Sequence, residues 1–291
     1  MRPRFLPQFD SLYFRFVWKA LVGTIPWSED VNRLGMVEID PHARDEFEAA
    51  SRALDSVGVW GGYFVDVAAS NGVHSSFIWP LLNSGSWAGL SVEMDPRKFA
   101  KLSYLYSRFD DVNLARIKVT PRNVCALLES HLVGHKFELL NLDIDSYDLA
   151  VLEAMLNGGF RPKVISMEIN EKIPPPIMFE VRYQDDHYWA GDHFYGCSLA
   201  SAQEKLSAYD YVLKEMVGGN AQFVEKSLIR DGFELPSLEE AYDLGYRHLP
   251  DRRGKFFYNS DVDHWLEIGT EAAKSQITGF FAQYAGQFDL S

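Results

Sequence analysis

The strongest constraint on the fold is an alternation of apolar, strand-like runs with helix-like segments between about residues 61 and 225. Five such runs follow one another in this order: GYFVDVA, WAGLSVEM, VNLARIKVT, KFELLNLDID and RPKVISMEIN. Strand-then-helix units of this length pair in parallel through right-handed crossovers. The chain is therefore predicted to be an α/β protein with a doubly wound, mostly parallel sheet.

The segments outside this alternation suggest a division of the chain. Residues 59–227 are predicted to form the α/β domain, with helical extensions at 1–58 and 228–291. The N-terminal extension is aromatic and amphipathic. It is expected to pack on the domain, with a lid, a dimer contact or a membrane-surface helix as alternatives. The C-terminal extension is expected to pack on the domain, and the oligomeric state is left open.

Charge and cysteine content argue against several classes of protein. The formal net charge is −13, whereas a general nucleic-acid binder needs a basic face. The two cysteines, Cys125 and Cys197, are too few for a disulfide framework, which fits a reducing compartment. No stretch reaches the ~20 apolar residues of a membrane span. These observations predict a cytoplasmic protein that binds no nucleic acid and has no membrane span.

The first strand ends in VDVAASNG, which joins an acid to a turn of small residues. Ligands of open α/β sheets bind at the carboxyl ends of strands, where the strand order reverses. Ala68, Ser70 and Gly72 would let a ligand approach the main chain, and the N-terminus of the next helix would offer N–H groups to an anion. Asp66 would then meet a cationic group, which favours a zwitterion such as the tail of S-adenosylmethionine. Alternatively, Asp66 caps the helix or bonds the turn.

The second strand supplies a matching acid. GLSVEMDP contains Glu93, and a carboxylate at that strand tip can accept both hydroxyls of a ribose. Asp95 is expected to cap the following helix, with Pro96 at its first position. A dinucleotide site needs G-x-G-x-x-G, but this turn has only Gly72, and Asp66 would repel a pyrophosphate. A nicotinamide-dependent oxidoreductase is therefore the weaker alternative.

Four segments in this order resemble class I S-adenosylmethionine-dependent methyltransferases: FVDVAASNGVHSS, GLSVEMDP, FELLNLDIDSYDLAVLEAML and VISMEIN. LDIDSYDLAVLEAM is most similar to the FkbM-type branch, and the resemblance covers about residues 60–225. It implies a Rossmann-like fold and makes 59–227 the cofactor-binding domain. The glycines usual in the first motif are replaced by Ala68 and Ser70. The resemblance implies that the methionine end of the cofactor is held by Asp66, Ala68, Ser70 and Gly72. It also implies that Glu93 holds the ribose and that Asp143 faces the cofactor. The neighbouring residues Asn71 and Met94 complete the predicted cofactor-binding set.

Methyl transfer to a hydroxyl requires removal of a proton by a base or with the help of a metal ion. LDIDSYD places Asp143 and Asp145 on one side of an extended chain, and MEIN does the same for Glu168 and Asn170. If the fourth and fifth strands are neighbours, Asp143, Glu168 and Asn170 could bind a divalent cation such as Mg²⁺ or Ca²⁺. Alternatively, Asp145 and Asp148 serve the start of the next helix, and Glu168 bonds a substrate hydroxyl or the main chain.

Histidines are the other candidates for the base. His187 and His193 lie in QDDHYWAGDHFYG, a loop expected to cover the cleft, where a neutral imidazole could accept the proton. The predicted catalytic residues are therefore His187, His193 and Asp145. Aromatic residues of the same loop could line an acceptor pocket or form a small core beneath the loop.

These patterns predict an S-adenosylmethionine-dependent methyltransferase that methylates a hydroxyl of a small molecule, glycan or natural product. An NAD(P)-dependent oxidoreductase is one alternative. A non-catalytic partner protein with the methyltransferase fold is another, although the intact Asp66 and Glu93 argue against it.

Overall fold

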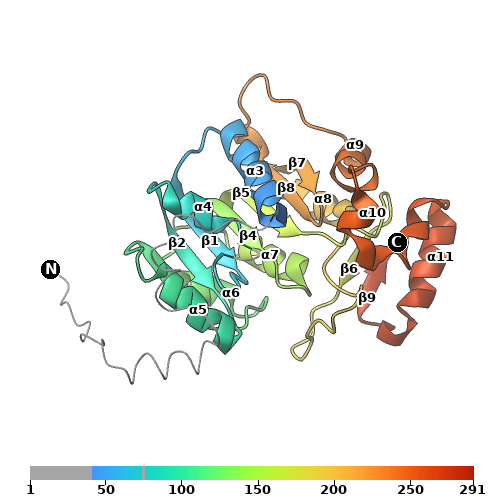
Figure 1. The fold of residues 1–291 in the computed structure, drawn as a ribbon, viewed down its shortest axis with the longest axis horizontal. Coiled ribbons are helices and arrows are strands. Elements are labelled where there is room, and N and C mark those ends of the chain that lie inside the picture. Colours follow the sequence, from blue (N-terminus) through green and yellow to red (C-terminus); the bar gives the residue numbers. More distant parts are fainter. Residues whose placement is uncertain (1–40, 74–75) are drawn as a thin grey trace.

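The computed structural model describes residues 41–73 and 76–291 (Figure 1). Residues 1–40, which make up most of the predicted N-terminal extension, lie outside this range. The described part of that extension contains the helix α3 (Pro41–Ser56), which contacts the strands at the far end of the sheet.

Seven strands form one sheet in the order β3-β2-β1-β4-β5-β8-β7. They are β1 (Gly62–Val67), β2 (Trp87–Val92), β3 (Val112–Ala115), β4 (Lys136–Leu142), β5 (Arg161–Glu168), β7 (Tyr211–Val217) and β8 (Asn220–Glu225). The first five pair in parallel, and β8 and β7 complete the sheet as an antiparallel hairpin. Strand order reverses between β1 and β4. This arrangement confirms the predicted doubly wound, mostly parallel, Rossmann-like sheet.

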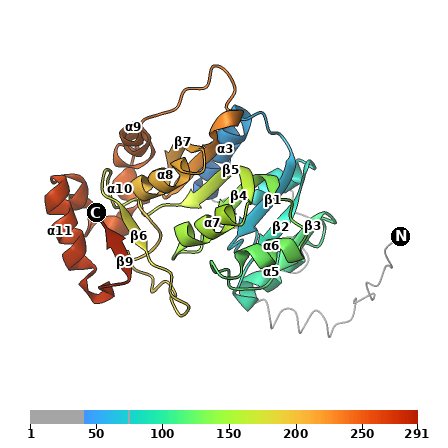
Figure 2. The same ribbon diagram turned by 180° about the vertical axis from the view of Figure 1, so that it is seen from behind.

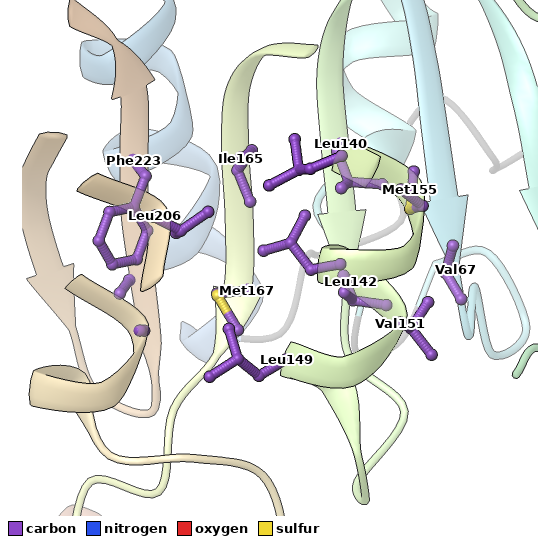
Figure 3. Packing of buried hydrophobic residues seen from close by; sticks show 14 of the residues in the cluster. Val67, Leu140, Leu142, Leu149, Val151, Met155, Ile165, Met167, Leu206 and Phe223 are labelled. Atoms are coloured by element: carbon purple, nitrogen blue, oxygen red, sulfur yellow. The ribbon is translucent and has the colours of Figure 1, made fainter. Parts of the chain in front are cut away.

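Helices cover both faces of the sheet because successive strand side chains point to opposite faces. Phe64, Leu139 and Val164 pack with α3, α4 and α5, whereas Val65 and Leu140 belong to the cluster of α6, α7 and α8. Figure 3 shows this second cluster, with α7 side chains lying against β4 and β5. The helices are α4 (Ile78–Asn83), α5 (Pro96–Tyr106), α6 (Val124–Ser130), α7 (Asp148–Asn157) and α8 (Leu199–Ser207).

Local signals place several helix boundaries. The Asp95 carboxylate accepts hydrogen bonds from the backbone N–H groups of Arg97 and Lys98, each at 2.8 Å, and Pro96 opens α5 as predicted. By contrast, α4 has only six residues and begins at Ile78. Among the described residues, the first motif is therefore followed by turn and bend rather than by the N-terminus of a helix.

Part of the C-terminal segment packs around a third apolar core. Phe179, Phe194, Trp265, Ile277 and Phe281 belong to this core. Its elements are β6 (Phe179–Val181), η5 (Asp263–Leu266), α11 (Thr270–Phe280), η6 (Ala282–Tyr284) and β9 (Phe288–Leu290). They lie at the opposite end of the molecule from β3 (Figure 2). The other elements after β8 are η2 (Lys226–Leu228), α9 (Leu238–Tyr242), η3 (Asp243–Arg247), α10 (Arg252–Lys255) and η4 (Phe257–Asn259). Buried residues of α9 and η3 pack in the cluster of α6, α7 and α8, and Leu228 of η2 packs against the cluster of α3, α4 and α5. Antiparallel pairing of β9 with β6 anchors the C-terminal segment beside the loop that carries the predicted histidines. Over residues 41–73 and 76–291, no helix combines the length and apolar character that crossing a membrane requires.

Candidate functional site

A cavity of about 410 Å³ opens at the carboxyl ends of β1, β2 and β4, where the strand order reverses. Pockets of roughly 300–1,000 Å³ are typical of small-molecule and cofactor sites. The lining includes seven of the residues predicted from the sequence, namely Ala68, Ser70, Glu93, Met94, Asp143, Asp145 and His187. Asp66, Asn71, Gly72, Glu168, Asn170 and His193, which were also predicted, do not line it.

The turn after β1 adopts the backbone conformation that glycine favours. Ala68 has a φ of 66°, Ser70 of 51° and Gly72 of 83°. Left-handed backbone costs a non-glycine residue roughly 1–2 kcal/mol, so other contacts must hold the turn. The Ser70 N–H donates to Oε2 of Glu93 at 2.9 Å, and the Ala69 N–H donates to the Val92 carbonyl at 2.9 Å. Ala68 and Ser70 thus both have the positive φ that glycine favours, although neither is a glycine.

Asn71 and Gly72 shape this turn from outside the cavity. Oδ1 of Asn71 accepts from the Val73 N–H at 3.0 Å. A Cβ atom added at Gly72 would lie 2.6 Å from both Leu102 Cδ1 and Tyr106 Cε1, and the Tyr106 hydroxyl donates to the Gly72 carbonyl at 2.8 Å. Gly72 is therefore required for the packing of α5 against the turn.

Gly72→Ala is expected to lower the free energy of unfolding by about 2–5 kcal/mol, because left-handed strain adds to overpacking. Urea unfolding measures this loss. Gly85→Ala is a matched control, since Gly85 also has positive φ but its added Cβ would have no neighbour within 4 Å. The free energy of unfolding of Gly85→Ala should fall by only about 1–2 kcal/mol, the cost of the left-handed backbone alone. Equal losses in both variants would contradict the packing role of Gly72.

Asp66 is fully buried at the end of β1. Its carboxylate accepts from Nδ2 of Asn141 at 2.9 Å and from the Ser76 hydroxyl at 3.5 Å. Burial raises the pKa of Asp66 to about 7, although both hydrogen bonds oppose the shift. These partners lie on β4 and just before α4, so among the described residues Asp66 neither caps α4 nor bonds the turn after β1.

Glu93 connects the first two strand ends. It is 5% exposed, and its Oε1 accepts from the Asp95 N–H at 2.7 Å while Oε2 accepts from the Ser70 N–H. A carboxylate offers about four lone-pair sites, so both oxygens keep capacity to accept bonds from a ligand in the cavity.

Three carboxylates converge at the ends of β4 and β5. Asp143, Asp145 and Glu168 each offer an oxygen, and these oxygens lie within 4.8 Å of one another. Burial, together with the neighbouring negative charges, raises the pKa of Asp143 and of Glu168 well above the usual range. Oε2 of Glu168 has no hydrogen-bond partner among the described residues. The arrangement offers several oxygen donors and an unfilled acceptor to a cation.

The neighbouring predicted residues have other contacts. Nδ2 of Asn170 donates to the carbonyls of His193 at 3.0 Å and Tyr195 at 2.9 Å, which ties β5 to the loop. Asp148 is buried, and its carboxylate accepts from the N–H groups of Ile144 at 2.8 Å and Ser146 at 3.1 Å. Asp148 thus serves the start of α7, as the alternative interpretation supposed.

The two loop histidines occupy different environments. His187 lines the cavity, and its Nε2 is buried without a hydrogen-bond partner among the described residues. Burial and then the Lys118 charge lower the pKa of His187, which favours the neutral imidazole. His193 instead places Nε2 3.1 Å from Oδ1 of Asp261, and its ring centroid lies 5.7 Å from that of Phe280.

Lys118, which the sequence patterns did not single out, ties this loop over the cavity. Its ammonium group donates to the carbonyls of Asp185 and His187, each at 2.9 Å. It also lies 3.8 Å from the Tyr188 ring centroid, in cation–π contact. Lys118 follows β3 at the carboxyl edge of the sheet, and that position was the only available signal in the sequence.

The aromatic residues of the loop divide between the two predicted roles. Tyr188 and Trp189 line the cavity, whereas Phe194 lies in the third core. The Tyr195 hydroxyl donates to Oε2 of Glu171 at 2.8 Å, within a buried cluster that also holds Lys172.

Comparisons with known proteins give structural likeness at low sequence identity. No family model matches the chain, and no curated protein matches its sequence. A structure described as the METTL16 MTase domain is 12% identical, covers 64% of this chain and 68% of that chain, and has a TM-score of 0.41. The N-terminal domain of EvdMO1 with SAH bound is 10% identical, with 64% and 80% covered and a TM-score of 0.40.

A third structure is described as a putative sarcosine dimethylglycine methyltransferase from Galdieria sulphuraria. It is 13% identical, with 57% of this chain and 61% of that chain covered and a TM-score of 0.38. Similarity at this level assigns no activity to this chain, so a function must be argued from the site itself.

Proposed function

We propose that this protein is an S-adenosylmethionine-dependent methyltransferase that methylates a hydroxyl oxygen. The observation that carries the proposal is the cavity at the strand-order reversal. There the left-handed turn of Ala68 and Ser70 is tied to Glu93, which follows β2, and Asp143, which follows β4, lines the same cavity. With Gly72 as its only glycine, this turn lacks a G-x-G-x-x-G motif, and among the described residues it is not followed directly by a helix N-terminus that could bind a pyrophosphate. A nicotinamide dinucleotide therefore fits it less well.

The lining residues fit the parts of this cofactor. The small side chains of Ala68 and Ser70 leave room for the amino-acid tail, and the spare lone pairs of Glu93 suit ribose hydroxyls. Met94 and Ile117 offer an apolar border suited to a flat base. When bound, the cofactor would supply an electrophilic methyl group on a sulfonium.

His187 is assigned the proton transfer. Its unpartnered Nε2 would accept the proton that the acceptor hydroxyl would lose as its oxygen takes the methyl group and the carbon–sulfur bond breaks. The products are a methyl ether, a neutral thioether and a protonated imidazole. Lys118 would hold His187 at the cavity by its bond to the His187 carbonyl.

Asp143, Asp145 and Glu168 are further proposed to bind a divalent cation such as Mg²⁺. Their close oxygens and the unpartnered Oε2 of Glu168 support this assignment. A bound cation would lower the pKa of a hydroxyl nearby. Asn170, the remaining predicted ligand, holds the loop through Nδ2, and its Oδ1 is buried without a hydrogen-bond partner among the described residues, so it is kept as a candidate ligand beside these three.

S-adenosylhomocysteine at about 100 times its Kd is expected to stabilise the protein by about 2.7 kcal/mol, because it binds only the folded chain. The unfolding midpoint should therefore rise by about 5 °C for a chain of this size, as measured by differential scanning fluorimetry. NAD at the same concentration is the control and should leave the midpoint unchanged. A rise with NAD but not with S-adenosylhomocysteine would overturn the proposal in favour of an oxidoreductase.

A further inference from the structure

A second cavity, of about 280 Å³, lies between the loop and the C-terminal segment. The loop contributes residues from Gln184 to Phe194, and the C-terminal segment contributes Tyr284 and Gln287. His187 and Tyr188 line both this cavity and the first one. The two cavities are thus neighbours that share a wall. His187, whose Nε2 is buried without a hydrogen-bond partner among the described residues, belongs to that wall.

The polar groups of the second cavity are available for a ligand. Within the part of the chain that the structure describes, the side chains of Gln184, Asp186 and Gln287 make no hydrogen bond. The two amides can each donate and accept, and the carboxylate accepts. Such a set can bind neighbouring hydroxyl groups, which both donate and accept.

Two stacked aromatic rings border this cavity. The rings of Phe194 and Tyr284 have centroids 3.9 Å apart and planes 8° apart. Phe194 is buried and covers one face of Tyr284, and Tyr284 is fixed by a hydrogen bond of its hydroxyl to Asp192. The rigid ring of Tyr284 can therefore pack against the C–H face of a saturated ring.

The charge of the lining selects against anions. Among the described residues that line the second cavity there is no lysine or arginine, and the single charged side chain is the carboxylate of Asp186. A phosphate or carboxylate ligand would meet repulsion there and no cationic partner. A neutral ligand with several hydroxyl groups meets complementary donors and acceptors instead.

We propose that the second cavity is the acceptor subsite and that it takes a neutral, polyhydroxylated ring, that is, a sugar-like acceptor. The inference rests on the proposed methyltransferase function, because it assigns the first cavity to the cofactor. The acceptor ring would pack against Tyr284, which Phe194 supports from behind, and its hydroxyls would bond Gln184 and Gln287. The hydroxyl to be methylated would then reach Nε2 of His187 at the wall shared with the first cavity.

The test is saturation-transfer NMR on the full chain loaded with S-adenosylhomocysteine, with methyl glucoside, methyl mannoside and methyl galactoside as probes. At least one glycoside should bind. Gln287→Ala and Gln184→Ala should each weaken that binding by about threefold to tenfold, the size expected for a lost neutral hydrogen bond. Gln283→Ala is the matched control, because Gln283 is exposed on the same C-terminal segment and does not line the cavity. It should leave glycoside binding unchanged.

Inorganic phosphate and catechol serve as competing probes. Glycoside binding that is weakened in both cavity variants and unchanged in Gln283→Ala supports the proposal. Absence of glycoside binding, equal binding by all variants, or preferential binding of phosphate or catechol would overturn it. S-adenosylhomocysteine binding, measured by calorimetry in the same samples, separates the two proposals. If it is retained while glycosides fail to bind, only the acceptor assignment falls, and if it is absent the methyltransferase proposal falls.

Discussion

With divalent cations removed by EDTA, the protein is expected to become less stable as the pH rises from about 4 to 8. The pKa of Asp66 is raised to about 7 by burial, and burial also raises the pKa of Asp148 to about 7. Both groups titrate near pH 3.9 in an unfolded chain. Between these values the folded state holds more protons than the unfolded state, so the free energy of unfolding falls with rising pH.

The expected loss is large. A shift of about three pKa units corresponds to roughly 4 kcal/mol for one group, and it is complete once the pH exceeds the folded pKa of about 7. Two other groups do not cancel it. Burial would raise the pKa of Glu171, but Lys172 and hydrogen bonds hold it below the usual range, so its contribution changes only below this window. The lowered pKa of His187 makes the free energy of unfolding rise with pH up to its unfolded pKa of about 6.5, which is the opposite trend. Because His187 is partly exposed, this effect is smaller.

Three variants separate the titration of Asp66 from cation binding. Asp66→Asn keeps a similar shape and hydrogen-bonding capacity, so in urea unfolding it should remove the share of the pH dependence that Asp66 contributes and leave the share of Asp148. Asp231→Asn, at an exposed loop position, is the control and should leave the pH dependence as in the wild type. Glu168→Gln removes one carboxylate from the acidic cluster and tests the cation.

At pH 8, adding Mg²⁺ should raise the unfolding midpoint of the wild type and of Asp66→Asn, because the cation neutralises Asp143, Asp145 and Glu168. Glu168→Gln should lose most of this response. A stability that is constant or rises between pH 5 and pH 8 in EDTA would contradict the buried acids as described. An undiminished Mg²⁺ response in Glu168→Gln would contradict the cation site.

The sheet and the approximate location of the site follow from local features of the sequence. Runs such as KFELLNL have the length and apolarity of buried strands, and Asp95 followed by Pro96 carries a local start signal for α5. Once parallel pairing is inferred, the ends of the strands must meet at one edge of the sheet. The positions of Glu93 and Asp143 at that edge follow from this geometry.

The details that decide the chemistry depend on contacts between distant residues. The positive φ of Ser70 is not encoded by serine itself; it accompanies the bond of its N–H to Glu93, 23 residues later. The two loop histidines were indistinguishable in sequence, because Asp261 and Phe280, which pack with His193, come from the C-terminal part. Lys118 could not be identified for the same reason, since its partners lie in the loop more than 60 residues away.

Replacing His187 is expected to have the largest effect on activity. His187→Gln should lower kcat/KM by about 10²–10⁴-fold, the usual contribution of a positioned general base. Binding of S-adenosylhomocysteine should be unchanged, because the substitution removes only the proton acceptor. His193→Gln is the matched control and should stay close to wild-type activity, since His193 contacts Asp261 outside the cavity. Transfer of a labelled methyl group to a glycoside that binds measures both variants.

The pH profile distinguishes a base from a residue that only positions the acceptor. Because burial and Lys118 lower the pKa of His187, the acid limb of kcat/KM in wild type should lie below pH 6.5. Lys118→Met removes the positive charge and both bonds to the loop, so the pKa of His187 should rise and the acid limb should move to higher pH. NMR titration of the His187 imidazole measures the same shift without any acceptor. An acid limb that stays in place while the imidazole pKa moves would show that another group takes the proton, whereas parallel movement of the two would identify His187 as the base.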